Sequence, residues 1–198
     1  AMCSATDSFD IALATQGIDA AHSVYDGTPI NKDLNNKVNF SNSLAFYDFE
    51  IITDPMVYEY SNIDYPPSNN VVVRGAEADY FSLFEFSAKY DPIPTMLTQN
   101  HVAVIKGFMG QTTGFDREKI KKHVLILGED ETTPQVKYLH GNIGQGTFTF
   151  LGGHDPEDYQ HYVGDPQTDL SLHRNSPGYR LILNNILFPA ARKKERKT

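Results

Sequence analysis

The stretch TFTFLGGHDPEDYQHYVGD, residues 147–165, runs from an alternating strand through two glycines into a cluster of His, Asp and Glu. Aromatic and β-branched residues alternating with smaller ones predict a strand over 146–153. The glycines allow a tight turn, which would deliver His154 to the carboxyl end of that strand, where open α/β sheets place their sites. The single cysteine lies at the opposite end of the chain, at position 3. Much therefore depends on whether the fold brings Cys3 and His154 together.

Length and composition favour one globular domain. The 198 residues are 40% hydrophobic and 21% charged, which is ordinary for a folded protein and enough for one core. We expect a single α/β domain over residues 1–191 and a disordered basic tail, RKKERKT, over 192–198. The net charge of −8 disfavours nucleic acid as a partner, because phosphate binding needs a basic surface. No apolar run approaches the roughly 18 residues of a membrane span, so we expect no membrane partner.

The start of the chain leaves the compartment open. Its first residues, AMCSATDSFD, have neither the basic region nor the apolar stretch of a signal peptide. The chain need not begin where the gene product does, so a periplasmic, secreted or cytoplasmic location is equally compatible with it. One cysteine excludes an internal disulfide and any zinc site built from several thiolates.

Two helices and a series of strands are expected. Residues 4–15 predict a helix that begins with a capping box of Ser4 and Asp7. A second helix follows Pro177, with an apolar stripe of Tyr179, Ile182, Leu183, Ile186 and Leu187. The segment 111–122 favours one short helix, and 18–45 an irregular excursion. Besides 146–153, strands are expected at 49–52, 71–74, 81–89, 101–110, 123–129 and 136–141. These elements predict an α/β fold with a mixed sheet, an antiparallel excursion within 48–110 and flanking helices.

Cys3 stands directly before the first expected helix. Exposed N–H groups and the helix dipole at that end favour the thiolate form, as a catalytic nucleophile requires. A sharp strand-to-helix turn is how α/β enzymes expose such a group, yet only two residues precede Cys3. The alternative is a small buried apolar residue, which is the more frequent role of a single cysteine.

The sequence GGHDPED, residues 152–158, offers a base and its acidic partners. A histidine at the end of a strand can serve as general base, with Asp155 or Glu157 holding its ring. We expect the His154 ring to be partly buried and hydrogen-bonded to one of these acids. Alternatively, DPED is an Asp-Pro turn and helix cap, which explains the acids but leaves His154 without a role.

The same region is rich in residue types that bind metals. His154, Glu157, His161, Asp165, Asp169 and His173 all lie within 154–173. Their spacing matches no recognised zinc or manganese signature. We therefore expect no bound transition metal, and the sequence suggests no other cofactor.

Three segments resemble a known family. They are AMCSATDSFDIALA, TMLTQNHVAVIKGFMGQTTGF and the run from GTFTFLGGHDPEDYQHYVGDPQTDL to the C-terminus. They look like the C-terminal half of a bacterial family labelled asparagine synthetase B, a likeness that covers almost the whole chain. That family resembles the class I glutamine amidotransferase-like superfamily, which includes the ThuA-like proteins and has a flavodoxin-like fold. Nothing in the chain resembles the nucleophile domain or ATP-binding loop of true asparagine synthetases.

The resemblance implies a hydrolytic site. In amidotransferases a cysteine occupies the strand–helix elbow and a late His-Pro-Glu supplies the base and its orienting acid. Carried over by motif, Cys3 is the nucleophile, His154 the base and Glu157 the acid. The sequence reads His-Asp-Pro-Glu, however, so Asp155 could replace Glu157. The elbow has Ala1 and Ala5 where the family pattern has glycines. These departures imply an altered or lost activity on a small amide, ester or sugar-derived substrate.

Two further expectations follow from the resemblance. The first half of the family precedes Met2, so this chain is expected to lack the strands that would cover its elbow. An uncovered edge favours self-association, and we expect a homodimer with an interface that involves residues 1–15. The alternative to an enzyme is a non-catalytic carbohydrate-binding, protein-binding or structural module.

Overall fold

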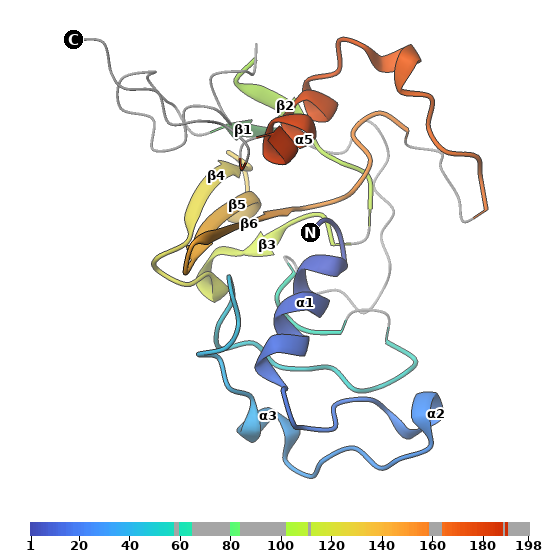
Figure 1. Ribbon diagram of the computed structural model, residues 1–198, viewed down its shortest axis with the longest axis vertical. Helices are drawn as coiled ribbons and strands as arrows, with labels where there is room; N and C mark the ends of the chain where they lie inside the picture. The colour runs from blue at the N-terminus through green and yellow to red at the C-terminus, as the bar shows by residue number, and fades with distance from the viewer. Residues whose placement is uncertain are drawn as a thin grey trace.

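The computed structural model describes residues 1–57, 60–64, 80–83, 102–110, 112–158, 164–187 and 189. Its longer helices are α1 (Ala5–Ala14) and α5 (Pro177–Leu187), with short α-helices α2 (Ser23–Asp26) and α3 (Leu34–Lys37). The 3-10 turns are Arg117–Lys119 and Leu170–His173. The strands are β1 (Tyr80–Leu83), β2 (Val104–Lys106), β3 (Phe115–Asp116), β4 (Leu125–Glu129), β5 (Gln135–Ile143) and β6 (Gly146–Leu151). Figure 1 shows α1 on one side of the sheet and α5 on the other.

The sheet is antiparallel. Its order is β2-β1-β4-β5-β3, with β6 also paired to β5. All pairings between the named strands run antiparallel, and within the described ranges the one parallel pairing is an isolated bridge from Met2 to Leu151. The expected α/β class with flanking helices is confirmed. The expected mixed sheet is therefore an antiparallel one in the described part of the chain, where β4, β5 and β6 follow one another as consecutive antiparallel strands.

Two apolar clusters cover the two faces of the sheet. On the α1 side Phe46, Phe115 and Phe150 pack together, and none is more than 1% exposed. On the α5 side the cluster centres on Tyr138 and Leu181, both fully buried. The sheet is therefore the middle layer of three, as in other α/β arrangements. No helix within the described ranges is long and apolar enough to cross a membrane.

Helix α1 is held by a buried carboxylate near its middle. Asp10 is fully buried, and its oxygens accept backbone N–H groups of Leu44, Ala45 and Phe46 at 2.7 to 2.8 Å. Burial raises the pKa of Asp10, although the three hydrogen bonds act in the opposite direction. The expected capping box is wrong, because Ser4 makes no side-chain cap bond. The sheet and loop contacts, rather than a cap, fix where this helix begins.

Helix α5 begins where expected but buries a different face. The Ser176 hydroxyl accepts the N–H of Tyr179 at 3.2 Å, and Pro177 is the first helical residue. The buried residues are Gly178, Leu181 and Asn184, not the predicted stripe. A Cβ on Gly178 would lie 2.3 Å from Pro156 Cβ, so only glycine allows this approach. Ile186 is left 68% exposed.

Other predicted elements had mixed outcomes. The strands expected at 123–129, 136–141 and 146–153 correspond to β4, β5 and β6. The strand expected at 49–52 is absent, and Ile51 makes only an isolated bridge to Ser61. The helix expected within 111–122 is reduced to a 3-10 turn. The expectations for 71–74, most of 81–89 and the tail 192–198 lie outside the described residues.

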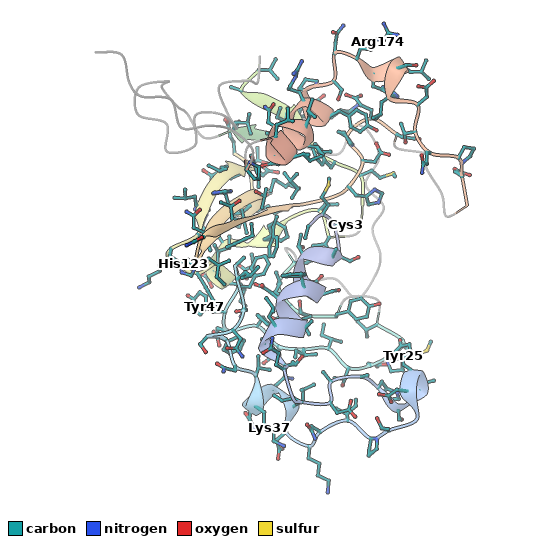
Figure 2. All side chains as sticks on the ribbon, viewed as in Figure 1. Cys3, Tyr25, Lys37, Tyr47, His123 and Arg174 are labelled. Atoms are coloured by element: carbon teal, nitrogen blue, oxygen red, sulfur yellow. The ribbon has the colours of Figure 1, made fainter. Side chains whose placement is uncertain are left out.

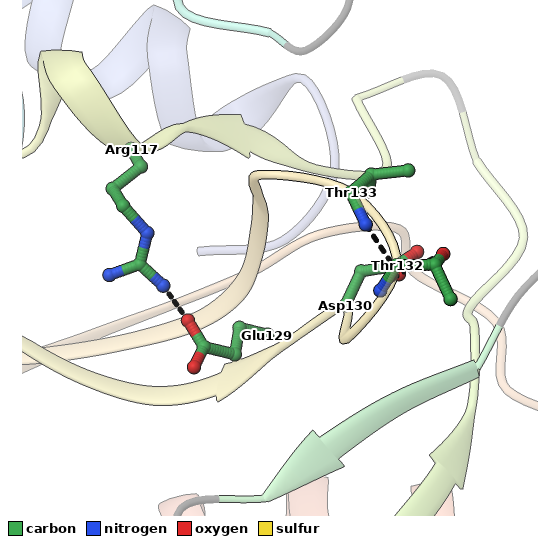
Figure 3. A network of polar contacts seen from close by, with 5 residues as sticks. All are labelled: Arg117, Glu129, Asp130, Thr132 and Thr133. Carbon is green, nitrogen blue, oxygen red and sulfur yellow. Dashed lines mark hydrogen bonds and ion pairs between the residues drawn. The ribbon is translucent and has the colours of Figure 1, made fainter.

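Polar contacts fix the connection from β4 to β5. The Asp130 carboxylate accepts the N–H groups of Thr132 and Thr133 at 2.7 and 3.1 Å, which closes the turn (Figure 3). Beside it, Arg117 forms an ion pair with Glu129 of β4. Both ion-pair side chains are close to half exposed, so the pair adds little to stability. The buried strand β5, with its partner strands β3, β4 and β6, is the stable frame for the site.

Candidate functional site

The N-terminal residues meet the carboxyl end of β6, the strand that leads to His154. The N–H of Cys3 donates to the carbonyl oxygens of both Leu151 and Gly153, each at 3.1 Å. The N–H of Leu151 in turn donates to the carbonyl of Ala1. Residues 1–3 thus run alongside β6 in the parallel direction. Cys3 therefore lies against Gly153, the residue that precedes His154, so the fold does bring the cysteine close to the histidine.

Cys3 occupies a strained turn between this strand-like segment and α1. Its φ of 54° is in the left-handed region, which residues other than glycine seldom adopt. The Cys3 carbonyl accepts the N–H and the hydroxyl of Thr6, which ties the turn to the first turn of the helix. Figure 2 shows Cys3 at the end of α1 nearest the sheet. Cys3 is 7% exposed, which agrees with the alternative role of a small buried residue. The geometry of its turn, in contrast, matches that of a nucleophile elbow.

Gly110 reveals how close the cysteine and the histidine are. A Cβ built on this glycine would lie 3.0 Å from Cys3 Sγ and 3.2 Å from His154 Cδ2. Because both atoms lie so close to the same added Cβ, the distance between Cys3 Sγ and His154 Cδ2 cannot exceed the sum of these two distances. The imidazole Nε2 is bonded to Cδ2, so a ring nitrogen lies in the same small region as the thiol. A side chain at 110 would contact both groups.

The turn that carries His154 is fixed by its neighbours. Gly153 has a φ of 74°, and a Cβ there would lie 2.6 Å from the carbonyl oxygen of Phe108. The backbone N–H of His154 donates to Met109 O at 2.7 Å, and Met109 N–H donates to Asp155 O at 2.8 Å. The segment 108–110 therefore clamps the turn from one side. This clamp sets where the imidazole can be placed.

The His154 ring is exposed to solvent, which corrects the expectation of a partly buried ring. No hydrogen bond from the ring to Asp155, Glu157 or another acid is found among the described residues. The ring stands at the rim while the thiol lies beneath the surface. The structure thus brings together two of the four residues that the sequence proposed for catalysis.

Asp155 is engaged elsewhere. It is 8% exposed, and its Oδ1 accepts the N–H groups of Glu157 and Asp158 and the hydroxyl of Tyr179. Burial, together with the hydrogen bond to Asp155, raises the pKa of Tyr179 to about 12. These contacts are the ones expected if DPED, residues 155–158, forms an Asp-Pro turn and helix cap. Asp155 holds the turn after His154 and ties it to α5, rather than orienting the imidazole.

Glu157 lines a polar hollow next to the turn. The hollow has a volume of about 480 Å³, and Asp158, Asp169 and His173 also line it. Glu157 is half-buried and contributes its backbone N–H to Asp155. Over the described ranges, no group of three or more His, Cys, Asp or Glu side chains could hold a metal ion. Asp165 is exposed, and His161 lies outside these ranges.

Three positioning residues were not singled out from the sequence. Gly110 and Met109 were placed inside an expected strand, and Tyr179 was assigned to the core stripe of the last helix. A glycine within a strand pattern often marks a close approach of backbone or side chains, and Gly110 is such a case. No local signal connects Tyr179 with Asp155, because the two residues meet only through the packing of α5 on the turn.

Comparisons with known proteins add no assignment. No model of a protein family, no curated protein and no solved structure matches this chain. The resemblance drawn from the sequence motifs therefore remains a proposal, and the function must be argued from the site alone.

Proposed function

We propose that Cys3 and His154 form a thiol–imidazole pair that hydrolyses a small amide or acyl substrate. One observation carries this proposal: the thiol and the ring converge on the vacant side-chain position of Gly110, although they come from opposite ends of the chain. A cysteine in a left-handed turn before a helix, next to a histidine at a strand end, is the arrangement that nucleophilic catalysis needs.

The chemistry uses these two residues in turn. His154 accepts the thiol proton as Cys3 Sγ bonds to the carbonyl carbon, and the carbonyl π electrons move to its oxygen. The Ser4 N–H has no acceptor among the described residues and is a donor for that oxyanion at the start of α1. The oxyanion collapses to a thioester, and His154 protonates the leaving amine or alkoxide. Water then cleaves the thioester, which releases the acid and restores the thiol.

The proposal includes a relationship to the amidotransferase-like superfamily and its flavodoxin-like fold. Its support is the turn at Cys3, the parallel bridge from Met2 to Leu151, and the histidine that follows β6. Because Asp155 serves the turn and no acid hydrogen bonds to the His154 ring in the described part of the chain, the base lacks an orienting partner. We infer an activity weaker than, or different from, that of a complete triad.

A non-catalytic binding or structural module is the second candidate. The low exposure of Cys3 and the capping role of Asp155 favour it, because both are explained without catalysis. On this alternative, the closeness of Cys3 and His154 is a packing contact and the imidazole has no influence on the thiol. The two candidates thus differ in one measurable property, the dependence of thiol reactivity on His154.

The test is the rate of Cys3 alkylation by iodoacetamide between pH 6 and pH 9. We expect the protein to react faster near neutral pH than glutathione, and His154→Asn to slow the reaction by about tenfold. The matched control is His123→Asn, since His123 is exposed and lies in the turn before β4, away from Cys3 (Figure 2). Cys3→Ser gives the blank. Equal rates for the protein and His154→Asn would exclude the pair and leave the binding module.

A second assay measures turnover rather than reactivity. With p-nitrophenyl acetate, a burst of p-nitrophenol equal to the protein concentration is expected from acylation of Cys3. Cys3→Ser should abolish the burst, and His154→Asn should slow it without reducing its final size. A burst that persists in Cys3→Ser would place the chemistry at another residue.

A further inference from the structure

The carbonyl group of Cys3 is held by two donors from a single residue. Thr6 donates its backbone N–H to Cys3 O at 3.0 Å and its hydroxyl to the same oxygen at 2.7 Å. The Thr6 side chain is fully buried, so this hydroxyl is shielded from water. On its other side, Cys3 donates its own N–H to carbonyl groups at the end of β6. Both peptide groups that flank the Cys3 Cα are therefore fixed in direction.

The direction of the Cys3 carbonyl sets the direction of the Ser4 N–H. The two groups belong to one planar trans peptide, in which the C=O and N–H bonds point in opposite directions. Because Thr6 holds the carbonyl toward the first turn of α1, the Ser4 N–H points away from that turn, where no acceptor for it is found among the described residues. In a nucleophile elbow, the N–H of the residue after the nucleophile is the one that binds the oxyanion.

The Thr6 hydroxyl also strengthens this donor. A hydrogen bond to a carbonyl oxygen draws electron density from the peptide and makes its N–H a better donor, as in chains of hydrogen bonds that polarise one another. The effect is greatest when negative charge develops beside the N–H, which happens during acylation and not in the resting protein. The Thr6 hydroxyl thus acts through the Ser4 N–H on the step that forms the oxyanion.

We propose that Thr6 is a positioning residue for the oxyanion donor, because its hydroxyl orients and polarises the peptide between Cys3 and Ser4. This role rests on the proposed function, since it acts on the transfer of an acyl group to Cys3. In that step Sγ bonds to the carbonyl carbon, the thiol proton passes to His154, and the carbonyl π electrons move to the oxygen beside the Ser4 N–H. When these electrons return, the bond to the leaving group breaks.

The same helix contains an internal comparison. Thr15 also donates both its N–H and its hydroxyl to one carbonyl, that of Ile11, at 2.9 and 2.8 Å. Such bonds from threonine to a preceding carbonyl are frequent in helices and have no function by themselves. The peptide that follows Ile11 lies inside α1, where N–H groups bond to the carbonyl four residues earlier. Thr15 therefore makes the same contact as Thr6, but with no N–H available to a ligand behind it.

The experiment compares two reactions of Cys3 in the full chain. Iodoacetamide alkylates the thiol without forming an oxyanion, whereas p-nitrophenyl acetate forms one before p-nitrophenolate leaves. Thr6→Val should slow the p-nitrophenol burst about tenfold and change the alkylation rate by less than about twofold. Thr6→Ser, which keeps the hydroxyl, should restore the burst rate to within about threefold of the unsubstituted protein. Thr15→Val, the matched control, should leave both rates unchanged.

The outcomes separate the role of Thr6 from the proposed function. If the unsubstituted protein shows no burst that Cys3→Ser abolishes, the pair is not catalytic and the role of Thr6 fails with it. If that burst is present and Thr6→Val matches Thr15→Val, the role of Thr6 alone is overturned. Equal losses of acylation and alkylation in Thr6→Val would also overturn it, because they mean that the turn and its thiol have moved. Circular dichroism verifies folding, and Thr6→Ala with Thr15→Ala replaces the valine pair if Thr6→Val does not fold.

Discussion

Replacing Gly153 by alanine tests the close approach that places His154. The φ of Gly153 is 74°, and an added Cβ would lie 2.6 Å from Phe108 O and 2.8 Å from its carbonyl carbon. Backbone atoms cannot rotate away as a side chain can. Gly17 is a matched control, since its φ is 77° and an added Cβ meets nothing within 4 Å. The two substitutions share the conformational cost and differ in the overlap.

The magnitudes follow from this difference. A left-handed alanine costs about 1–2 kcal/mol, part of which is offset because alanine restricts the unfolded chain. Gly17→Ala should therefore lower the free energy of unfolding by about 1 kcal/mol. Gly153→Ala adds an overlap that forces a backbone shift, worth about 1–3 kcal/mol more. Its total cost should be about 2–4 kcal/mol.

The assay is urea unfolding followed by far-ultraviolet circular dichroism, with unchanged slopes as the condition for comparison. Alkylation of Cys3 gives a second readout, since Gly153 O accepts the Cys3 N–H and a backbone shift would move both Cys3 and His154. Gly153→Ala should slow alkylation, and Gly17→Ala should not. If the two variants unfold within about 0.5 kcal/mol of each other, the packing of the turn against Phe108 is wrong.

Four further outcomes are expected. Gly110→Ala should slow Cys3 alkylation about tenfold and also lower the free energy of unfolding, because at a φ of 154° its Cβ would lie 3.0 Å from both Cys3 Sγ and the Cα of Gly153; an unaltered alkylation rate would contradict the shared space. Tyr179→Phe should cost about 1–2 kcal/mol at pH 8. The pKa of Tyr179 is raised from 10.0 to about 12, so its contribution is complete below pH 10 and lost as pH rises through 12, a loss absent from the variant. Burial lowers the pKa of His140 from 6.5, so stability should fall as pH decreases below 6.5, and His140→Gln should flatten that part of a urea titration. Sedimentation decides the expected homodimer, since a mass of 22.2 kDa unchanged by dilution would mean a monomer.

The elements that sequence reasoning placed correctly depend on local pattern. Alternation of aromatic and β-branched residues is dense in 146–151, and the strand there needs no distant contact to be recognised. The helix expected at 4–15 was found at Ala5–Ala14 because its composition suffices to identify it, even though its capping box is absent. Pro177 likewise marks the start of α5 in the sequence and in the structure.

The errors come from contacts that no periodicity reports. The stripe predicted for the last helix follows hydrophobicity, yet α5 packs through Gly178 because Pro156 and Phe108 must approach its backbone. Close packing then decides which face is buried, and Ile186 is left outside. Asp155 was a candidate partner for His154, but the hydroxyl of Tyr179 competes for the same oxygen from a helix that is distant in sequence.

The meeting of Cys3 and His154 depends on register more than on either residue. Cys3 reaches the turn because its N–H bonds to Leu151 and Gly153, and a slip of the segment 1–3 by two residues along β6 would move it by about 6.6 Å. A slip by one residue would turn its side chain to the other face of the sheet. The hydrogen bonds between residues 1–3 and β6 therefore determine where the thiol lies.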